Sequence, residues 1–206
     1  MFAQARFLNE EDGKSGLRKA FESRRPWLFL DRDGILIQDT GYPHRISDCH
    51  IEEEFIPIAL AFQSQLWPVA IVTNQAGLAK NKFDIQDYEY FSSHLIKELE
   101  KCGFKTEHWE FCPFHPDGSN PKFTKNSVYR KPYPGMFLKF AEDHAIDFSH
   151  SIMIGDKDSD QPLYITMRTL FKRTRYPLTK QPVFETFCDL EEYVKENLKD
   201  PIHPQS

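Results

Sequence analysis

A run of four apolar residues, 27–30, leads directly into Asp31, and a second carboxylate follows at Asp33. Such a run, preceded by Pro26, is typical of a central strand in a parallel sheet. Carboxylates at the C-terminal end of that strand lie in the crevice where open α/β sheets bind ligands. Two negative charges this close need a proton or a cation between them. The pattern suggests an aspartate nucleophile beside an aspartic acid/base, with a divalent ion.

Taken alone, the Asp-x-Asp-Gly motif has two other interpretations. It can be a strand end whose acids are simply solvated. It can also begin a calcium loop, which needs a glycine at its sixth position and a glutamate at its twelfth. Here Gly34 is the fourth residue and Tyr42 the twelfth, so the calcium interpretation fails. Gly34 permits a sharp turn that directs both acids into one volume, and the choice between the two remaining interpretations depends on residues elsewhere.

Length and composition restrict the class of protein. The 206 residues suffice for one domain with a substantial core. A formal net charge of −5 gives no basic stripe for nucleic acid. No apolar run approaches a membrane span, and the first residues lack the apolar core of a signal peptide. The cysteines (Cys49, Cys102, Cys112 and Cys188) form no C-x-x-C pair, as is typical of reduced thiols. We expect a cytoplasmic protein that binds neither nucleic acid nor membrane.

The chain divides into three segments. Residues 1–25 form a polar N-terminal extension with a short helix expected over 17–24, residues 26–200 form the single catalytic domain, and residues 201–206 form a C-terminal tail. Within the domain, apolar periodicity predicts strands alternating with helices. The predicted strands span 27–30, 68–74, 108–112 and 151–154, with 163–171 completing the sheet. The predicted helices span 53–66, 84–102, 135–144 and 189–198. Pro162 argues against a helix after Asp160.

The strand predicted over 68–74 ends in Thr73 and Asn74, followed by Gln75 and Gly77. A hydroxyl and an amide before a glycine turn suit a phosphate oxygen bound by side chains and backbone N–H groups. A plain helix cap is the alternative. We expect Thr73 and Asn74 to bind phosphate and Gln75 to contact substrate.

A turn-rich loop over residues 39–44 follows the paired carboxylates and should lie above them. Loops on a rigid scaffold often contact substrate, although a plain surface turn is equally consistent with these residues. Farther along, the irregular segment 113–129 is longer than compact domains usually tolerate without a function. It ends at Arg130 and Lys131, which prolines and a glycine fix at a helix start. A fixed lysine can neutralise a transferring phosphoryl group; two solvated surface bases are the alternative.

The strand over 151–154 again delivers an acid, Asp156, with Asp160 four residues later. Four strand ends thus bear groups that together fit attack of a carboxylate on a phosphoryl group. Asp31 would attack phosphorus, and Asp33 would protonate the leaving oxygen and then deprotonate water. The phosphoryl oxygens would be held by Thr73, Asn74 and Lys131. The Mg²⁺ ligands would be Asp31, Asp156 and the backbone carbonyl of Asp33, with Asp160 orienting them.

In this order, the motifs DRDG, VTNQAG, RKPxPGM and GDKxxD resemble the haloacid dehalogenase (HAD) superfamily over residues 27–160. More narrowly, the chain resembles the D-glycero-D-manno-heptose 1,7-bisphosphate phosphatases and the related histidinol-phosphate phosphatases. The resemblance implies a Rossmann-like three-layer α/β sandwich with a mainly parallel sheet and a minimal cap domain or none. It also implies that substrate contacts, rather than chemistry, fall to Asp39, Gly41, Tyr42, Arg130 and Lys157.

One departure from these relatives concerns zinc, which they bind through C-x-H and C-x-C in the loop before the Arg-Lys pair. The corresponding positions here are Cys112, Phe114, Ser127 and Tyr129, with His115 one place beyond the usual histidine. A tetrahedral site needs four ligands, so we predict no structural zinc. We expect packing of Phe111, Phe114, Phe123 and Tyr129 to hold the loop instead. Ile35, where the relatives usually have threonine, and Pro162 are milder departures.

These inferences predict a cytoplasmic Mg²⁺-dependent phosphatase, monomeric or homodimeric, that acts on a small phosphorylated sugar through a phosphoaspartate. Heptose bisphosphate is the first candidate substrate and histidinol phosphate the second. A homologue that binds a phosphometabolite without hydrolysing it, and phosphotransfer to another acceptor, are the alternatives.

Overall fold

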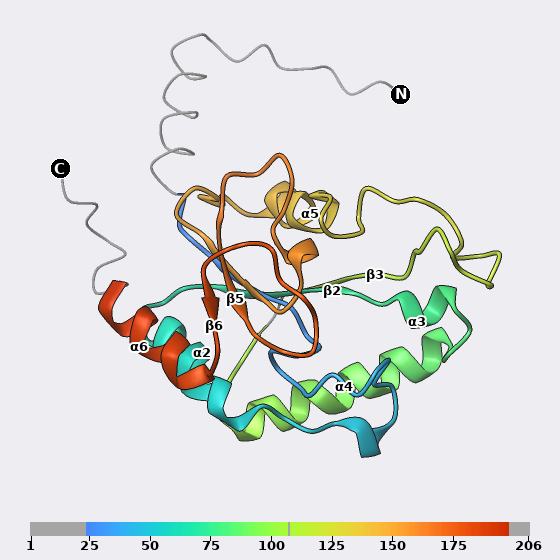
Figure 1. The fold of residues 1–206 in the computed structure, drawn as a ribbon, viewed down its shortest axis with the longest axis horizontal. Helices are drawn as coiled ribbons and strands as arrows, with labels where there is room; N and C mark the ends of the chain where they lie inside the picture. Colours follow the sequence, from blue (N-terminus) through green and yellow to red (C-terminus); the bar gives the residue numbers. More distant parts are fainter. Residues whose placement is uncertain (1–23, 107, 198–206) are drawn as a thin grey trace, which may run out of the picture.

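In the computed structural model, which describes residues 24–106 and 108–197, six parallel strands form one sheet in the order β3-β2-β1-β4-β5-β6 (Figure 1). The strands are β1 (Leu28–Leu30), β2 (Val69–Asn74), β3 (His108–Cys112), β4 (Ile152–Gly155), β5 (Arg168–Lys172) and β6 (Val183–Phe184). β1 pairs with both β2 and β4. Successive strands are added on one side of β1 up to β3, and on its other side from β4 onward. The carboxyl end of β1 therefore lies at the switch point where such sheets bind ligands. The predicted Rossmann-like α/β fold is confirmed.

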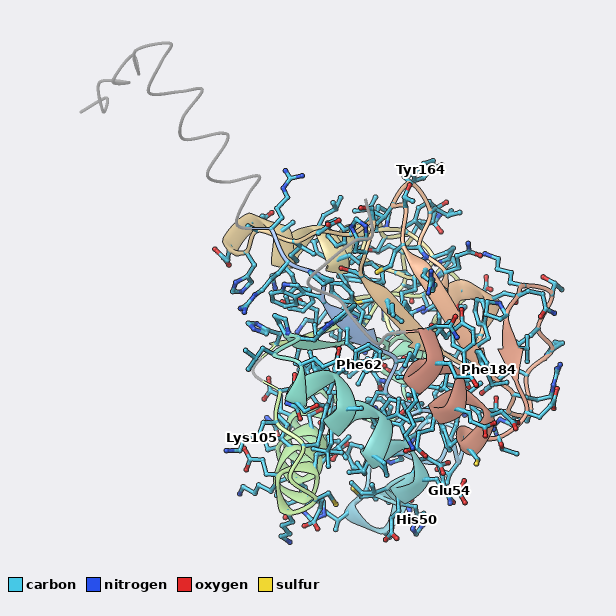
Figure 2. All side chains as sticks on the ribbon, turned by 90° about the vertical axis from the view of Figure 1, so that its left-hand side faces the viewer. His50, Glu54, Phe62, Lys105, Tyr164 and Phe184 are labelled. Carbon is cyan, nitrogen blue, oxygen red and sulfur yellow. The ribbon has the colours of Figure 1, made fainter. Side chains whose placement is uncertain are left out.

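Helices cover both faces of the sheet (Figure 1). On one face lie α2 (Ile56–Ser64), α4 (Ile85–Lys101) and α6 (Phe187–Asn197), and on the other lies α5 (Gly135–Asp143). Each face has its own apolar cluster: Phe62 and Leu95 belong to the first, and Phe29 and Phe137 to the second. Figure 2 shows Phe62 directed into the interior, whereas Tyr164 stands at the periphery with 87% exposure. Burial on both faces explains why β1 is wholly apolar.

Local signals set the ends of the helices. Asp84 caps α4 by accepting a hydrogen bond from the Asp87 backbone N–H, and the Asp87 carboxylate accepts one from the Asp84 N–H in return. Shorter helical turns complete the chain: η1 (Ile46–Asp48), η2 (Glu53–Phe55), α3 (Ala76–Ala79) and η3 (Asp158–Asp160). The predicted helix over 53–66 therefore begins as the 3-10 turn η2 and continues as α2.

Several predicted bounds need correction. β6 was not predicted, because two residues cannot display a strand period, yet it pairs with β5 at the edge of the sheet. β5 begins at Arg168 rather than near residue 163, and α6 begins at Phe187 rather than 189. The helix expected over 17–24, most of the N-terminal extension and the C-terminal tail lie outside the described residues.

Within the described part, no helix has both the length and the apolar character that crossing a membrane requires.

Candidate active site

The carboxyl ends of β1 and β4 bring three buried acids together. Asp31 follows β1, Asp156 follows β4, and Asp160 ends η3; an oxygen from each lies within 4.8 Å of the others. This is the only group of three or more His, Cys, Asp or Glu side chains within the described ranges that is placed to hold a metal ion. The predicted meeting of Asp31 and Asp156 is therefore present in the structure. The carboxylate of Asp33 is not part of the group, and its backbone carbonyl stays a predicted ligand.

Lys131 neutralises part of this charge. Its Nζ lies 2.9 Å from Asp31 Oδ1 and 2.7 Å from Asp160 Oδ1, and it donates a 2.7 Å hydrogen bond to the Val72 carbonyl. Burial alone would lower the pKa of Lys131, but the two carboxylates raise it above its ordinary value. Burial alone would raise the pKa of Asp31, but the charges of Lys131 and Lys157 lower it. Asp31 is thus held ionised, as a nucleophile requires.

Asn74 uses its side chain to hold the Lys131 backbone. Its Nδ2 donates to the Lys131 carbonyl and its Oδ1 accepts from the Lys131 N–H, both at 3.0 Å. One N–H and the oxygen of the amide are therefore engaged, and the second N–H of Nδ2 is left for a phosphate oxygen. Thr73 is 1% exposed, and its hydroxyl accepts a 2.9 Å hydrogen bond from Gln75 Nε2. The phosphate-binding roles of both residues stay predictions.

The environment of Asp156 is set from three sides. Lys157 Nζ lies 2.9 Å from Asp156 Oδ1, and the Thr174 hydroxyl donates to Oδ2 at 2.9 Å. Gly34, with φ of +90°, leaves room for this carboxylate, because a Cβ there would overlap Asp156 Oδ2. Burial raises the pKa of Asp156 to about 7; Lys157 opposes the shift, and Asp31 and Asp160 add to it.

Asp33 is held by the buried guanidinium of Arg32, which is not among the predicted site residues. Arg32, fully buried, donates from Nε to Asp33 Oδ1 at 2.7 Å and from Nη2 to Oδ2 at 3.1 Å. Gln75 Nε2 donates to the same Oδ2 at 3.2 Å. No local pattern predicts this contact, because alternation along an extended chain would direct Arg32 away from both neighbouring acids.

A cavity of about 280 Å³ opens over these groups. The predicted site residues that line it are Asp31, Asp33, Asp39, Gly41, Tyr42, Asn74, Gln75, Arg130, Lys131, Lys157 and Asp160. Lys80, His115, Arg175 and Tyr176 line it as well and were not predicted. The loop over 39–44 therefore does lie above the acids. Lys80, Arg130 and Arg175 give the rim positive charge, which suits an anionic ligand.

The chain after β5 closes one wall of this cavity. Tyr176 donates its hydroxyl to Asp39 Oδ2 at 2.7 Å, and Arg175 Nη2 lies 2.8 Å from Asp39 Oδ1. Lys157 Nζ lies 3.4 Å from Asp39 Oδ2 and 4.3 Å from the centroid of the Tyr176 ring. Sequence patterns gave no signal for this wall, because the segment has no periodicity and its path depends on tertiary contacts.

Three of the four aromatic residues expected to hold the irregular segment 113–129 do pack: Phe114 against one apolar cluster, and Phe111 and Phe123 against another. Phe114 contacts Phe123 with ring centroids 6.1 Å apart, and Phe111 packs against Tyr88 at 4.2 Å. Tyr129, however, is 40% exposed, so its expected packing role is wrong. The Ser119 and Asn120 N–H groups both donate to the Ala79 carbonyl, and Lys125 Nζ lies 4.1 Å from the Phe114 ring centroid. Backbone hydrogen bonds and this cation–π contact supplement the packing. The absence of a structural zinc stays a prediction.

The cluster of Asp31, Asp156 and Asp160 fits a hard divalent cation. Its donors are all carboxylate oxygens, the ligand type that Mg²⁺ prefers. Burial raises the pKa of Asp160 as it does that of Asp156, so ionising the two carboxylates is unfavourable, and a bound cation would offset this cost. The residues present can therefore hold Mg²⁺.

Comparison with known proteins gives sequence relatives over most of the chain. A family model described as HAD-hydrolase-like matches residues 128–161. The D-glycero-beta-D-manno-heptose-1,7-bisphosphate 7-phosphatase of Yersinia pestis is 31% identical over 183 residues, covering 84% of this chain and 97% of the relative. The enzyme of that name from Escherichia coli O6:H1 is 31% identical over 183 residues, covering 84% and 96%.

Solved structures share the fold. A Mesorhizobium loti protein of the HAD-like phosphatase type superposes with a TM-score of 0.74 at 25% identity, covering 85% of this chain and 87% of its own. The D,D-heptose 1,7-bisphosphate phosphatase of B. bronchiseptica, crystallised with magnesium and phosphate, gives 0.68 at 21% identity, covering 83% and 98%.

Proposed function

The chain belongs to the HAD-like phosphatase family, and from this membership we propose that it is a Mg²⁺-dependent phosphatase. Its substrate is a small phosphorylated sugar, and its intermediate is a phosphoaspartate on Asp31. One observation supports this most directly: Asp31 and Asp160 line the cavity and meet the buried Asp156, with the Lys131 ammonium 2.9 Å from Asp31.

In the first step, an oxygen of Asp31 attacks phosphorus as the bond from phosphorus to the leaving oxygen breaks. Asp33 gives its proton to that oxygen. In the second step, water attacks the phosphoaspartate, Asp33 takes a proton from the water, and the bond between Asp31 and phosphorus breaks. The products are the free alcohol and inorganic phosphate. Throughout both steps Lys131 offsets negative charge on the phosphoryl oxygens.

Asp31, Asp156 and the Asp33 carbonyl would hold Mg²⁺, which when bound offsets the repulsion between the carboxylate and the anionic phosphate. Asp160 acts on this set indirectly. Its Oδ2 accepts hydrogen bonds from the backbone N–H groups of Asp156 and Lys157, both at 2.9 Å. It thereby fixes the turn that presents the Asp156 carboxylate.

Support for a sugar substrate comes from the cavity rim and from the names of the relatives. Asp39 and Tyr42 offer a carboxylate and a phenol for hydroxyl groups, and Arg130 and Lys157 offer positive charge for phosphate. We propose a heptose bisphosphate as the first substrate to test and histidinol phosphate as the second. The four cysteines are all free thiols, which agrees with the proposed cytoplasmic location.

The test is phosphate release by the purified full chain from a panel of esters, with Mg²⁺ and with chelator. The panel contains both anomers of heptose 1,7-bisphosphate, histidinol phosphate and para-nitrophenyl phosphate. Mg²⁺-dependent release that is fastest from a heptose bisphosphate supports the proposal. Faster phosphate release from histidinol phosphate would show that the second candidate, and not a heptose bisphosphate, is the substrate. Binding of the esters without any release identifies a non-catalytic homologue, and formation of a new phosphate ester identifies a phosphotransferase.

A further inference from the structure

Arg32 is the largest charged side chain buried beside the site, and no step of the proposed reaction uses it. Besides its two contacts to Asp33, its Nη2 donates to the Pro43 carbonyl and to Gln75 Oε1, both at 3.1 Å. Its guanidinium carbon lies 5.1 Å from the centroid of the Phe91 ring. Arg32 therefore joins β1, the loop over 39–44 and the end of β2.

Fold stability alone does not account for a guanidinium in this position. Desolvating a charge is expensive, and well-packed apolar residues commonly replace buried ion pairs without loss of stability. Here one partner is fully buried, whereas the Asp33 side chain is 14% exposed and lines the cavity. The pair thus extends from the core to the reaction space, with only its acid end accessible.

The hydrogen bonds to Asp33 leave one oxygen less occupied than the other. A carboxylate offers about four lone-pair positions, two on each oxygen. Oδ2 accepts from both Arg32 Nη2 and Gln75 Nε2, whereas Oδ1 accepts only from Arg32 Nε. The planar fork of arginine also fixes the plane of the carboxylate. An acceptor position therefore remains on Oδ1.

We propose that Arg32 is a positioning residue that fixes the Asp33 carboxylate so that Oδ1 is the atom that exchanges protons. The inference rests on the proposed function. In the first step the proton on Oδ1 passes to the leaving oxygen as its bond to phosphorus breaks. In the second step a proton of the attacking water passes to Oδ1 as the bond between Asp31 and phosphorus breaks. Arg32 and Gln75 donate hydrogen bonds in both steps and exchange no proton.

The test uses the dependence of the rate on the leaving group, which a merely structural role would not change. A sugar alkoxide needs protonation to leave, whereas para-nitrophenolate leaves readily without it. Arg32→Lys keeps the charge but loses the fork. We expect it to lower kcat/KM for the sugar phosphate by about 10²-fold and that for para-nitrophenyl phosphate by less than about threefold, within the range of general acid catalysis.

Controls separate this effect from damage to the fold. Arg173→Lys is the matched control, because Arg173 makes a 2.8 Å ion pair with Glu185 that is largely exposed and does not line the site cavity. In an Asp33→Asn background, adding Arg32→Lys should cause no further selective loss on the sugar phosphate. Circular dichroism and thermal unfolding show whether the lysine variant folds. If it does not, the two esters are compared in Arg32→Gln, which removes the charge.

The outcomes are distinct. If the wild type is active but the Arg32 variants lose the same factor in kcat/KM for both esters, the inference is overturned and the proposed function stands. The same holds if Arg32→Lys still causes a selective loss on the sugar phosphate in the Asp33→Asn background. A wild type that releases phosphate from neither ester overturns the proposed function and the inference with it.

Discussion

The hydroxyl of Thr174 donates a 2.9 Å hydrogen bond to Oδ2 of Asp156, joining the segment after β5 to the acid at the end of β4. The other oxygen of Asp156 faces Lys157. Thr174, which follows β5, and Lys157, which follows β4, therefore bind different oxygens of Asp156 and together fix the orientation of its carboxylate.

Thr174→Val should weaken Mg²⁺ binding by about 10–100-fold, the usual cost of removing a hydrogen bond to a metal ligand. Titration calorimetry of the metal with the purified protein measures it. Thr169→Val is the matched control, since the Thr169 hydroxyl is buried without a hydrogen-bond partner and its loss should leave Mg²⁺ affinity unchanged. Equal affinities in the two variants would contradict the assignment of Thr174.

Gly34→Ala should both destabilise the fold and displace Asp156. The positive φ costs about 1–2 kcal/mol for a residue with a Cβ, and here that Cβ would also overlap Asp156 Oδ2. Gly103→Ala separates the two effects, because Gly103 has a similar φ of +82° but its Cβ would meet nothing closer than 3.9 Å. Only Gly34→Ala should lose Mg²⁺ affinity. Urea unfolding and metal titration of both variants test this.

Asp31→Asn should abolish turnover while leaving the fold intact, because an amide cannot replace the attacking carboxylate. We expect kcat to fall by at least about 10³-fold, as for other enzymes that lose their nucleophile. Asp143→Asn, at the exposed end of α5, controls for the loss of one negative charge. Mg²⁺-dependent turnover by Asp31→Asn at more than a trace of the wild-type rate would remove Asp31 from its proposed role.

Lys131→Met should cost about 3–5 kcal/mol of folding stability, because it leaves two buried carboxylates without their cation. Lys139→Met is the control for losing a lysine at a surface pair: Lys139 contacts Glu110 with its side chain 49% exposed, and such pairs contribute at most about 1 kcal/mol. The free energy of unfolding in urea distinguishes them. A Lys131 variant as stable as the Lys139 variant would show that the acids are neutral in the fold.

Asp39 should make part of the stability dependent on pH. Burial alone would raise the pKa of Asp39, but the hydrogen bond from Tyr176 and the charge of Lys157 lower it below its ordinary value of 3.8. A carboxylate with a lowered pKa contributes stability above pH 3.8, and that contribution is lost as the pH falls through the folded-state pKa. The free energy of unfolding should therefore fall less steeply in acid for Asp39→Asn than for wild type, with Tyr176→Phe intermediate. Identical slopes would refute this.

The sequence predicted the position of the site better than the orientation of its side chains. Parallel strands end at one edge of a sheet, so the acids after 27–30 and 151–154 had to approach each other, and Asp31 and Asp156 do. The prediction of Lys131 followed from the chemistry of an anionic phosphate. These inferences needed only the direction of the strands and the charge of the ligand.

Orientation depends on partners that no local pattern reveals. Asp33 turns toward Arg32 because a guanidinium packed over Phe91 is fixed there. Asp39 is held by Tyr176, which follows it by more than half the chain and approaches only through the path after β5. β6 is too short for its pattern to be recognised, although it completes the sheet. Such contacts follow from tertiary packing, which sequence periodicity does not encode.

The grip of Asn74 on the peptide of Lys131 has an evolutionary consequence. Strand β2 anchors the lysine at three points, two through the Asn74 amide and one through the Val72 carbonyl. The irregular segment between β3 and Lys131 is therefore not needed to orient the ammonium group. It can accumulate substitutions, or replace one set of stabilising contacts with another. Diversification of this loop, by natural drift or by grafting, can proceed while the reactive centre stays in register.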